Sequence, residues 1–219
     1  MTFSHDEARR FYDRFGAKQD WQKWYEDRAI ADLIANASFE KAASVLEFGC
    51  GTGRLAETLL VQHLPPTARY LALDISTTMV SLARKRLMRF GDRVDVRRTS
   101  GEMQLPVESG TCDRVLSCYV LDLLSDNDIR RLIHEAHRVL SSGGHLAISS
   151  LTHGTAWIPR LIERAWVLVY SNRPGWVGGC RPIAVRSYLD DSGWKVSHRA
   201  EIVQWGVTSE VVVAERITD

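Results

Sequence analysis

A short apolar run that ends in three closely spaced glycines constrains this chain more than any other feature. Residues 45–55 read Val-Leu-Glu-Phe-Gly-Cys-Gly-Thr-Gly-Arg-Leu, and leucines at helical spacing follow. Glycines let the backbone turn without a Cβ clash and let a ligand lie directly against the peptide. The helix that follows offers free N–H groups and a partial positive charge at its start. The pattern therefore predicts a strand, a tight turn and a helix, with a ligand site at the turn.

A carboxylate at the end of the next apolar run indicates a nucleoside ligand. Asp74 closes the run 70–74, and a carboxylate in that place can accept hydrogen bonds from both ribose hydroxyls. A dinucleotide site requires the pattern G-x-G-x-x-G, whereas Arg54 stands at the third glycine position. That departure, and the lack of any recognisable hydride-transfer constellation, count against a dinucleotide enzyme.

Apolar runs alternate with helical patterns through the middle of the chain. Strands are expected at 44–48, 69–74, 93–98, 113–118 and 145–150, and helices at about 53–63, 77–90 and 126–140. This alternation predicts a doubly wound parallel sheet. Two later runs, about 195–204 and 208–217, can pair as a hairpin around Gly206 and add an antiparallel edge strand. The predicted fold class is α/β, doubly wound and Rossmann-like, with a seven-stranded, mostly parallel sheet.

The two ends of the chain carry the elements that would close a site. Residues 5–36 have a helical pattern with a joint at Gly16, and a pattern at 155–170 predicts a helical lid after the fifth strand. A loop at 171–182 and a short helix at about 182–192 are expected next. We expect a single domain, made of an N-terminal helical cap, a nucleoside-binding core, and a lid with terminal strands: 1–219, divided as 1–40, 41–151 and 152–219.

Composition limits the classes of function. With 28 basic and 27 acidic side chains in 219 residues, no overall field would attract nucleic acid. No stretch reaches the roughly 20 apolar residues of a membrane span, and the first residues lack a secretory pattern. The four cysteines have no metal-binding spacing, so no metal is expected and they are interpreted as reduced thiols. These features predict a cytoplasmic protein.

The glycine pattern, with an acidic residue two places before its first glycine, resembles a known family. Glu47-x-Gly49-x-Gly51-x-Gly53 is similar to the S-adenosylmethionine (SAM) loop of class I methyltransferases of the methyltransferase type 11-like group, broadly those of quinone biosynthesis. Three later segments match this family in order, at 100–106, 112–122 and 135–148. The resemblance implies SAM as the cofactor and S-adenosylhomocysteine (SAH) as the product.

The same resemblance assigns roles to residues at the ends of the strands. The implied SAM-binding residues are Glu47, Gly49, Cys50, Gly51, Gly53, Asp74, Ile75, Met79, Gly101, Glu102, Ser117, Cys118 and Tyr119. Glu102 stands nearest to the place of the acidic residue that usually holds the adenine amino group. The candidate bases by position are Tyr119, Asp122 and His153, and each of them could equally be structural. Tyr12 and Tyr25 could close over the carboxylate of SAM or serve as ordinary packing aromatics.

The predicted reaction is transfer of a methyl group from SAM to a small-molecule acceptor by in-line displacement. Holding donor and acceptor in line would be the main task of the protein. The acceptor could be hydrophobic or aromatic, and the oligomeric state is left open. Methylation of a phospholipid or lipid-like amine is an alternative, because residues 156–170 could lie on a membrane surface. A non-catalytic SAM-binding module is another.

Nucleic acid is the disfavoured acceptor. The basic residues between Arg84 and Arg98 span an expected surface helix and a neighbouring strand, where a solvated face is the simpler explanation. The N-P-P-[YF] tetrapeptide of relatives that methylate base amines is absent after the fourth strand.

Overall fold

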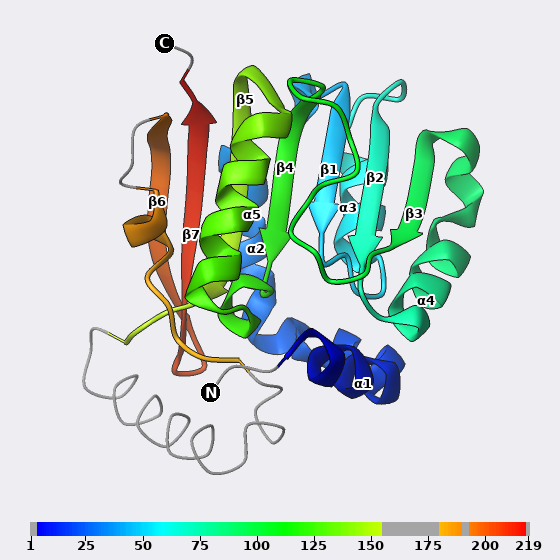
Figure 1. Cartoon of the computed structure of the whole chain (residues 1–219), viewed down its shortest axis with the longest axis horizontal. Helices are drawn as coiled ribbons and strands as arrows, with labels where there is room; N and C mark the ends of the chain where they lie inside the picture. The colour runs from blue at the N-terminus through cyan, green and yellow to red at the C-terminus, as the bar shows by residue number, and fades with distance from the viewer. Residues whose placement is uncertain (1–3, 155–179, 190–192, 218–219) are drawn as a thin grey trace.

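The computed structural model describes residues 4–154, 180–189 and 193–217, without the side chains of residues 18 and 21–23 (Figure 1). The lid pattern at 155–170 and most of the loop expected at 171–182 lie outside the described residues. None of the described helices is long and apolar enough to cross a bilayer.

Within the described residues, a seven-stranded sheet runs through the molecule in the order β3-β2-β1-β4-β5-β7-β6 (Figure 1). The strands are β1 (Ser44–Phe48), β2 (Arg69–Asp74), β3 (Val94–Arg98), β4 (Cys112–Cys118), β5 (Leu140–Leu151), β6 (Trp194–Gln204) and β7 (Val207–Arg216). Strands β1 to β5 pair in parallel, and β7 is antiparallel to both of its neighbours. The predicted fold class is confirmed, with the antiparallel strand one position in from the edge.

Helices lie on both faces of the sheet and at one end of it. The described helices are α1 (His5–Phe15), α2 (Lys23–Asn36), α3 (Arg54–Gln62), α4 (Thr77–Leu87) and α5 (Asp126–Val139), with 3₁₀ segments η1 (Gly16–Gln22), η2 (Phe39–Lys41), η3 (Met88–Arg93), η4 (Leu121–Leu123) and η6 (Val185–Tyr188). Most buried apolar side chains of α2, α3 and α4 pack in one core, and those of α5 pack in another across the sheet. Helix α1 buries no residue fully and lies beyond the carboxyl ends of the parallel strands (Figure 1).

Three expected element boundaries are corrected by the structure. Strand β5 begins at Leu140 rather than 145, because Leu140 already pairs with Cys112 and the register shifts before Arg114. Helix α4 ends at Leu87 and continues as η3, which is kinked at Gly91 by a φ of 54°. The helix expected at about 182–192 is a single 3₁₀ turn at 185–188, as far as it is described.

The hairpin expected around Gly206 is confirmed. Trp205 and Gly206 both have positive φ, 54° and 79°. Two successive residues with positive φ are characteristic of a type I′ turn, whose twist matches that of the paired strands. The turn therefore sets the register in which β6 and β7 pair.

A buried guanidinium joins the end of α2 to the sheet. Arg114 on β4 donates to the carbonyl oxygens of Ala37 at 2.6 Å and Ser38 at 2.7 Å, and also to that of Asp113. Burial lowers the pKa of Arg114. These bonds lie at the amino ends of the strands, so they hold the scaffold from the side away from the carboxyl ends.

Arg114→Ala should lower the free energy of unfolding by about 3 kcal/mol, because it leaves three carbonyl oxygens without their charged donor. Urea denaturation followed by circular dichroism measures this change. The control is Arg97→Ala, which removes a half-exposed ion pair with Asp95 and should cost less than about 1 kcal/mol. Equal losses in the two variants would contradict the anchoring role of Arg114.

Candidate active site

Two adjoining cavities lie at the carboxyl ends of the parallel strands. The first, of about 750 Å³ with the space open to solvent included, is bordered by Asp74, Ile75, Met79 and Gly101. The second, of about 580 Å³ on the same basis, is bordered by Glu26, Glu47, Cys50 and Arg54. The residues that border both cavities are Tyr12, Gln19, Gly49, Cys118 and Tyr119. Because the cavities share these walls, they form one site with two compartments, each large enough for part of a ligand.

The glycine loop runs along the cavities, which Gly49, Cys50 and Thr52 border. Gly49 and Gly51 have φ values of 82° and 53°, which disfavour any side chain. A Cβ on Gly49 would overlap Val120, and one on Gly51 would lie 2.5 Å from Oε1 of Gln19. That Oε1 atom is buried and has no hydrogen-bond partner among the described residues. A ligand lying along the loop could supply the missing donor.

Asp74 is fixed in place beside the first cavity. The backbone N–H of Gly51 donates to Oδ2, and that of Ser76 donates to Oδ1, both at 2.8 Å. Burial raises the pKa of Asp74 to about 6, against the lowering effect of these amides. The carboxylate retains lone pairs that could accept hydrogen bonds from ligand hydroxyls.

Glu47 is the buried carboxylate of the glycine-loop strand. The hydroxyl of Tyr70 donates to its Oε2 at 2.9 Å, and the residue borders the second cavity. Burial raises the pKa of Glu47 to about 8. A cation entering this cavity would favour the ionised carboxylate, so the site is suited to a positively charged group.

The cofactor residues expected from the sequence fall into two groups. Those that border one cavity or both are Glu47, Gly49, Cys50, Asp74, Ile75, Met79, Gly101, Cys118 and Tyr119. Gly51, Gly53, Glu102 and Ser117 do not border them. Gly53 lets α3 approach α4, since a Cβ there would lie 3.2 Å from Ala83. Glu102 is exposed, and the hydroxyl of Ser117 donates to the carbonyl oxygen of Phe48.

The three candidate bases are not brought together. Only Tyr119 borders the cavities. Its hydroxyl lies 2.8 Å from Oγ of Ser209, and burial raises its pKa. Asp122 is fully buried, and burial raises its pKa to about 7. His153 is exposed and borders neither cavity.

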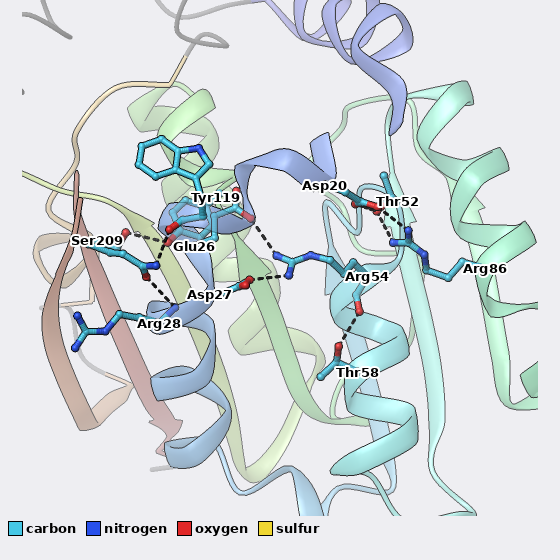
Figure 2. Close-up of polar contacts among 12 residues, drawn as sticks. Asp20, Glu26, Asp27, Arg28, Thr52, Arg54, Thr58, Arg86, Tyr119 and Ser209 are labelled. Atoms are coloured by element: carbon cyan, nitrogen blue, oxygen red, sulfur yellow. Dashed lines mark hydrogen bonds and ion pairs between the residues drawn. The ribbon is translucent and has the colours of Figure 1, made fainter. Parts of the chain in front are cut away.

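Carboxylates of the N-terminal segment attach it to the loops around the site (Figure 2). Asp20 accepts from Thr52 in the glycine loop and from Arg86 on α4, both at 2.6 Å. Asp27 accepts from Arg54 at 2.7 Å. Asp13 accepts from the hydroxyl of Ser76 at 2.6 Å. These contacts hold the segment over the site.

Sequence reasoning missed several residues that border the site. They are His5, Gln19, Glu26 and Arg54, whereas Tyr12 and Tyr25 had been considered. The one available signal was the recurrence of aspartate at positions 13, 20 and 27. Nothing in that spacing indicates which part of the core each carboxylate would meet.

Comparison with known proteins identifies the family. Residues 45–144 match the family model described as a methyltransferase domain. Malonyl-[acyl-carrier protein] O-methyltransferase of Marinomonas sp. (strain MWYL1) is 32% identical over 167 residues, covering 76% of this chain and 58% of that protein. Trans-aconitate 2-methyltransferase of Azoarcus sp. (strain BH72) is 27% identical over 205 residues, covering 89% and 73%.

Solved structures show the same fold. A chain of the complex between the Haloferax volcanii Trm112 methyltransferase activator and a putative methyltransferase superposes with a TM-score of 0.71 at 17% identity, covering 94% of this chain and 98% of that one. The N-methyltransferase NodS from Bradyrhizobium japonicum WM9, in complex with SAH, gives a TM-score of 0.64 at 19% identity, covering 87% of each chain.

The chain belongs to the class I SAM-dependent methyltransferases, for which SAM is the cofactor and SAH the product. It spans little more than half of the length of the Marinomonas relative, and 6% and 5% of two lovastatin diketide synthases that it also matches.

The raised pKa of Glu47 gives a testable dependence of stability on pH. This pKa is about 8 in the folded chain and 4.5 for an ordinary glutamate. The protonated Glu47 carboxyl group therefore contributes its full stabilisation below about pH 4.5. The contribution is lost as the pH rises through 8. Glu47→Gln, whose amide can still accept from Tyr70, should reduce the loss of unfolding free energy between pH 5.5 and 9 by roughly 2 kcal/mol or more.

Urea denaturation at several pH values, without SAM, measures this change. The control is Glu57→Gln, which removes a surface pair with Arg89 and should leave the pH dependence as in the wild type. If the stability of Glu47→Gln depends on pH as strongly as that of the wild type, the pKa of Glu47 is not raised in the folded chain.

Proposed function

We propose that this chain transfers a methyl group from SAM to a small-molecule acceptor that enters the second cavity. The observation that carries the proposal is the position of Asp74, which two backbone amides hold beside the first cavity at its junction with the glycine loop. A carboxylate held in this way is suited to the two hydroxyls of a ribose.

Residues around the two cavities would divide the binding of SAM between them. The first cavity offers apolar side chains for an adenine ring, including Ile75, Met79 and Met103. Glu47 and the glycine loop, with the open Oε1 of Gln19, offer polar groups for the methionine end. When bound, SAM supplies a methyl carbon already activated by its sulfonium.

Positioning would be the main contribution of the chain to the reaction. The hydroxyl groups of Tyr119 and Ser209 are hydrogen-bonded to each other. The rings of Tyr119 and Tyr25 contact edge to face, with their centroids 5.7 Å apart. Rings fixed in this way form rigid walls that exclude water and orient an acceptor. Orientation alone can lower a barrier by about 7–11 kcal/mol in favourable cases, so no dedicated base is required for an acceptor that reaches the site deprotonated.

The walls of the second cavity favour a hydrophobic or aromatic acceptor. Tyr12, Tyr25 and Tyr119 all border it. Arg54, which also borders it, is already paired with Asp27 and Glu26. The relatives named above act on malonyl-[acyl-carrier protein] and trans-aconitate, so acidic acceptors belong in any test. Residues 1–40 would act as the cap of this single domain, since Asp20 and Asp27 attach them to the core.

The structure weakens the case for a nucleic-acid acceptor. Several arginines of the basic cluster are engaged within the fold: Arg84 donates to the carbonyl oxygen of Val96, Arg89 to Glu57, and Arg93 to the carbonyl oxygen of Pro65. The basic cluster is therefore largely structural. The membrane alternative depends on residues 156–170, which lie outside the described part of the chain, and flotation with zwitterionic or anionic liposomes tests it.

Isothermal titration with SAM, SAH and NADH tests the assignment of the donor. We expect SAM and SAH to bind and NADH not to bind. Asp74→Ala should weaken SAM and SAH at least about tenfold, because it removes the acceptor of two hydrogen bonds. Asp95→Ala, on the exposed side of β3, is the control and should bind like the wild type. Binding of NADH, or of none of the three, would overturn the proposal.

Transfer of labelled methyl from SAM to a panel of acceptors tests the reaction. The panel contains phenols, aromatic amines, a malonyl thioester and trans-aconitate. We expect transfer to the aromatic members above transfer to the two acids. Preference for the acids would contradict the acceptor class, and SAM binding without transfer to any class would favour a non-catalytic SAM-binding module.

A further inference from the structure

A second carboxylate borders the second cavity, and no sequence motif indicated it. Glu26 on α2 is only 9% exposed. It forms an ion pair with Nη2 of Arg54 at 3.4 Å, whereas Arg54 makes a shorter contact of 2.7 Å with Asp27 (Figure 2). The positive charge of Arg54 is therefore shared, with Asp27 as the nearer partner. The negative charge of Glu26 is only partly balanced.

The surroundings of Glu26 would stabilise a positively charged ligand group. Burial raises the pKa of Glu26 to about 7, Arg54 on α3 opposes this shift, and Asp122 in η4 and Asp27 add to it. The other titratable groups that act on it or respond to it are Tyr12, Tyr25, Cys118, Tyr119 and Cys180. Burial raises the pKa of each of these, so they are neutral near pH 7. Partly desolvated carboxylates and tyrosine rings both stabilise positive charge.

The position of Glu26 separates it from Glu47. Glu47 stands on β1 beneath the glycine loop, whereas Glu26 comes from the N-terminal segment on the side of Tyr25 and Tyr119. Glu26 borders only the second cavity, but it acts electrostatically on Tyr119 and Cys118, which border both. It therefore lies near the wall that the two compartments share. In a SAM molecule that spans both compartments, the sulfur lies between the nucleoside and the amino-acid end.

We propose that Glu26 recognises the positive charge of the SAM sulfonium and thereby discriminates SAM from SAH. This inference rests on the proposed function. The two ligands share the adenosine and the amino acid, and they differ by the methyl group and by the charge on sulfur. A carboxylate that interacts with that charge stabilises the bound donor but not the bound product. Glu26 would thus act as a specificity-determining residue that eases release of SAH after transfer.

The affinity ratio should depend on pH. A cation prefers the ionised carboxylate, so protonating Glu26 must weaken SAM more than SAH. The preference for SAM should therefore be largest above pH 8 and fall as the pH drops through 7. Glu47 and Asp74 also titrate in this range, but they would face groups common to both ligands, and their effects largely cancel in the ratio.

Isothermal titration of wild type and Glu26→Gln with three probes tests the inference. The probes are SAM, SAH and sinefungin, an analogue with a cationic amine in place of the methylsulfonium. We expect Glu26→Gln to weaken SAM and sinefungin about tenfold, equivalent to about 1.4 kcal/mol, and to leave SAH nearly unchanged. Sinefungin separates recognition of charge from recognition of the methyl group.

Asp32→Asn, on the same helix as Glu26, is the matched control. It removes the contact with His198 and lies outside both cavities, so any effect should be equal for the three probes. Equal weakening of all probes by Glu26→Gln would assign Glu26 a structural role and overturn the inference. Unchanged binding of all three, with loss of methyl transfer, would assign it to the acceptor instead.

The pH series on the wild type keeps the test decisive if Glu26→Gln does not fold. A SAM-to-SAH affinity ratio that is constant from pH 6 to 8.5 would overturn the inference. Failure of the wild type to bind either SAM or SAH is a different result, because it would overturn the proposed function itself.

Discussion

The carboxylate of Asp74 is the interaction on which the rest of the site depends. It accepts one backbone N–H from the glycine loop after β1 and one from the start of α4 after β2. The β1–α3 and β2–α4 connections are thereby both hydrogen-bonded to the Asp74 side chain. The glycines of the loop adopt their positive φ values without strain, and this contact fixes the path of the loop. The shape of both cavities follows from that path.

Around this centre, the site gathers carboxyl groups whose ionised form burial disfavours. The pKa values of Glu26, Glu47 and Asp74 are raised to about 7, 8 and 6, each chiefly by burial. Such groups weaken the empty protein at neutral pH and strengthen the binding of cationic ligands. SAM, which carries a sulfonium and an ammonium, is a ligand of this kind. The N-terminal segment completes the arrangement by supplying Glu26 itself.

The sequence predicted the fold well because its signals are local. Alternating apolar runs and capped helices give strands and helices without reference to distant residues, and the glycine loop and Asp74 mark the ends of two adjacent strands. The family resemblance implied Glu102 and Ser117 as cofactor residues; in the structure Glu102 is exposed and the hydroxyl of Ser117 donates to the carbonyl oxygen of Phe48. Position after a strand shows where a residue lies but not where its side chain points.

The sequence by itself determined the alternation of strands and helices in the core, the glycine loop and the carboxylate beside it. Only the tertiary structure decided which residues of the N-terminal segment complete the site. Asp20 meets Arg86 across 66 residues and Glu26 meets Arg54 across 28. Neither pairing has a local pattern, because each depends on how η1 and the start of α2 lie at the carboxyl ends of the strands. That placement results from many long-range contacts together, and no single stretch of sequence encodes it.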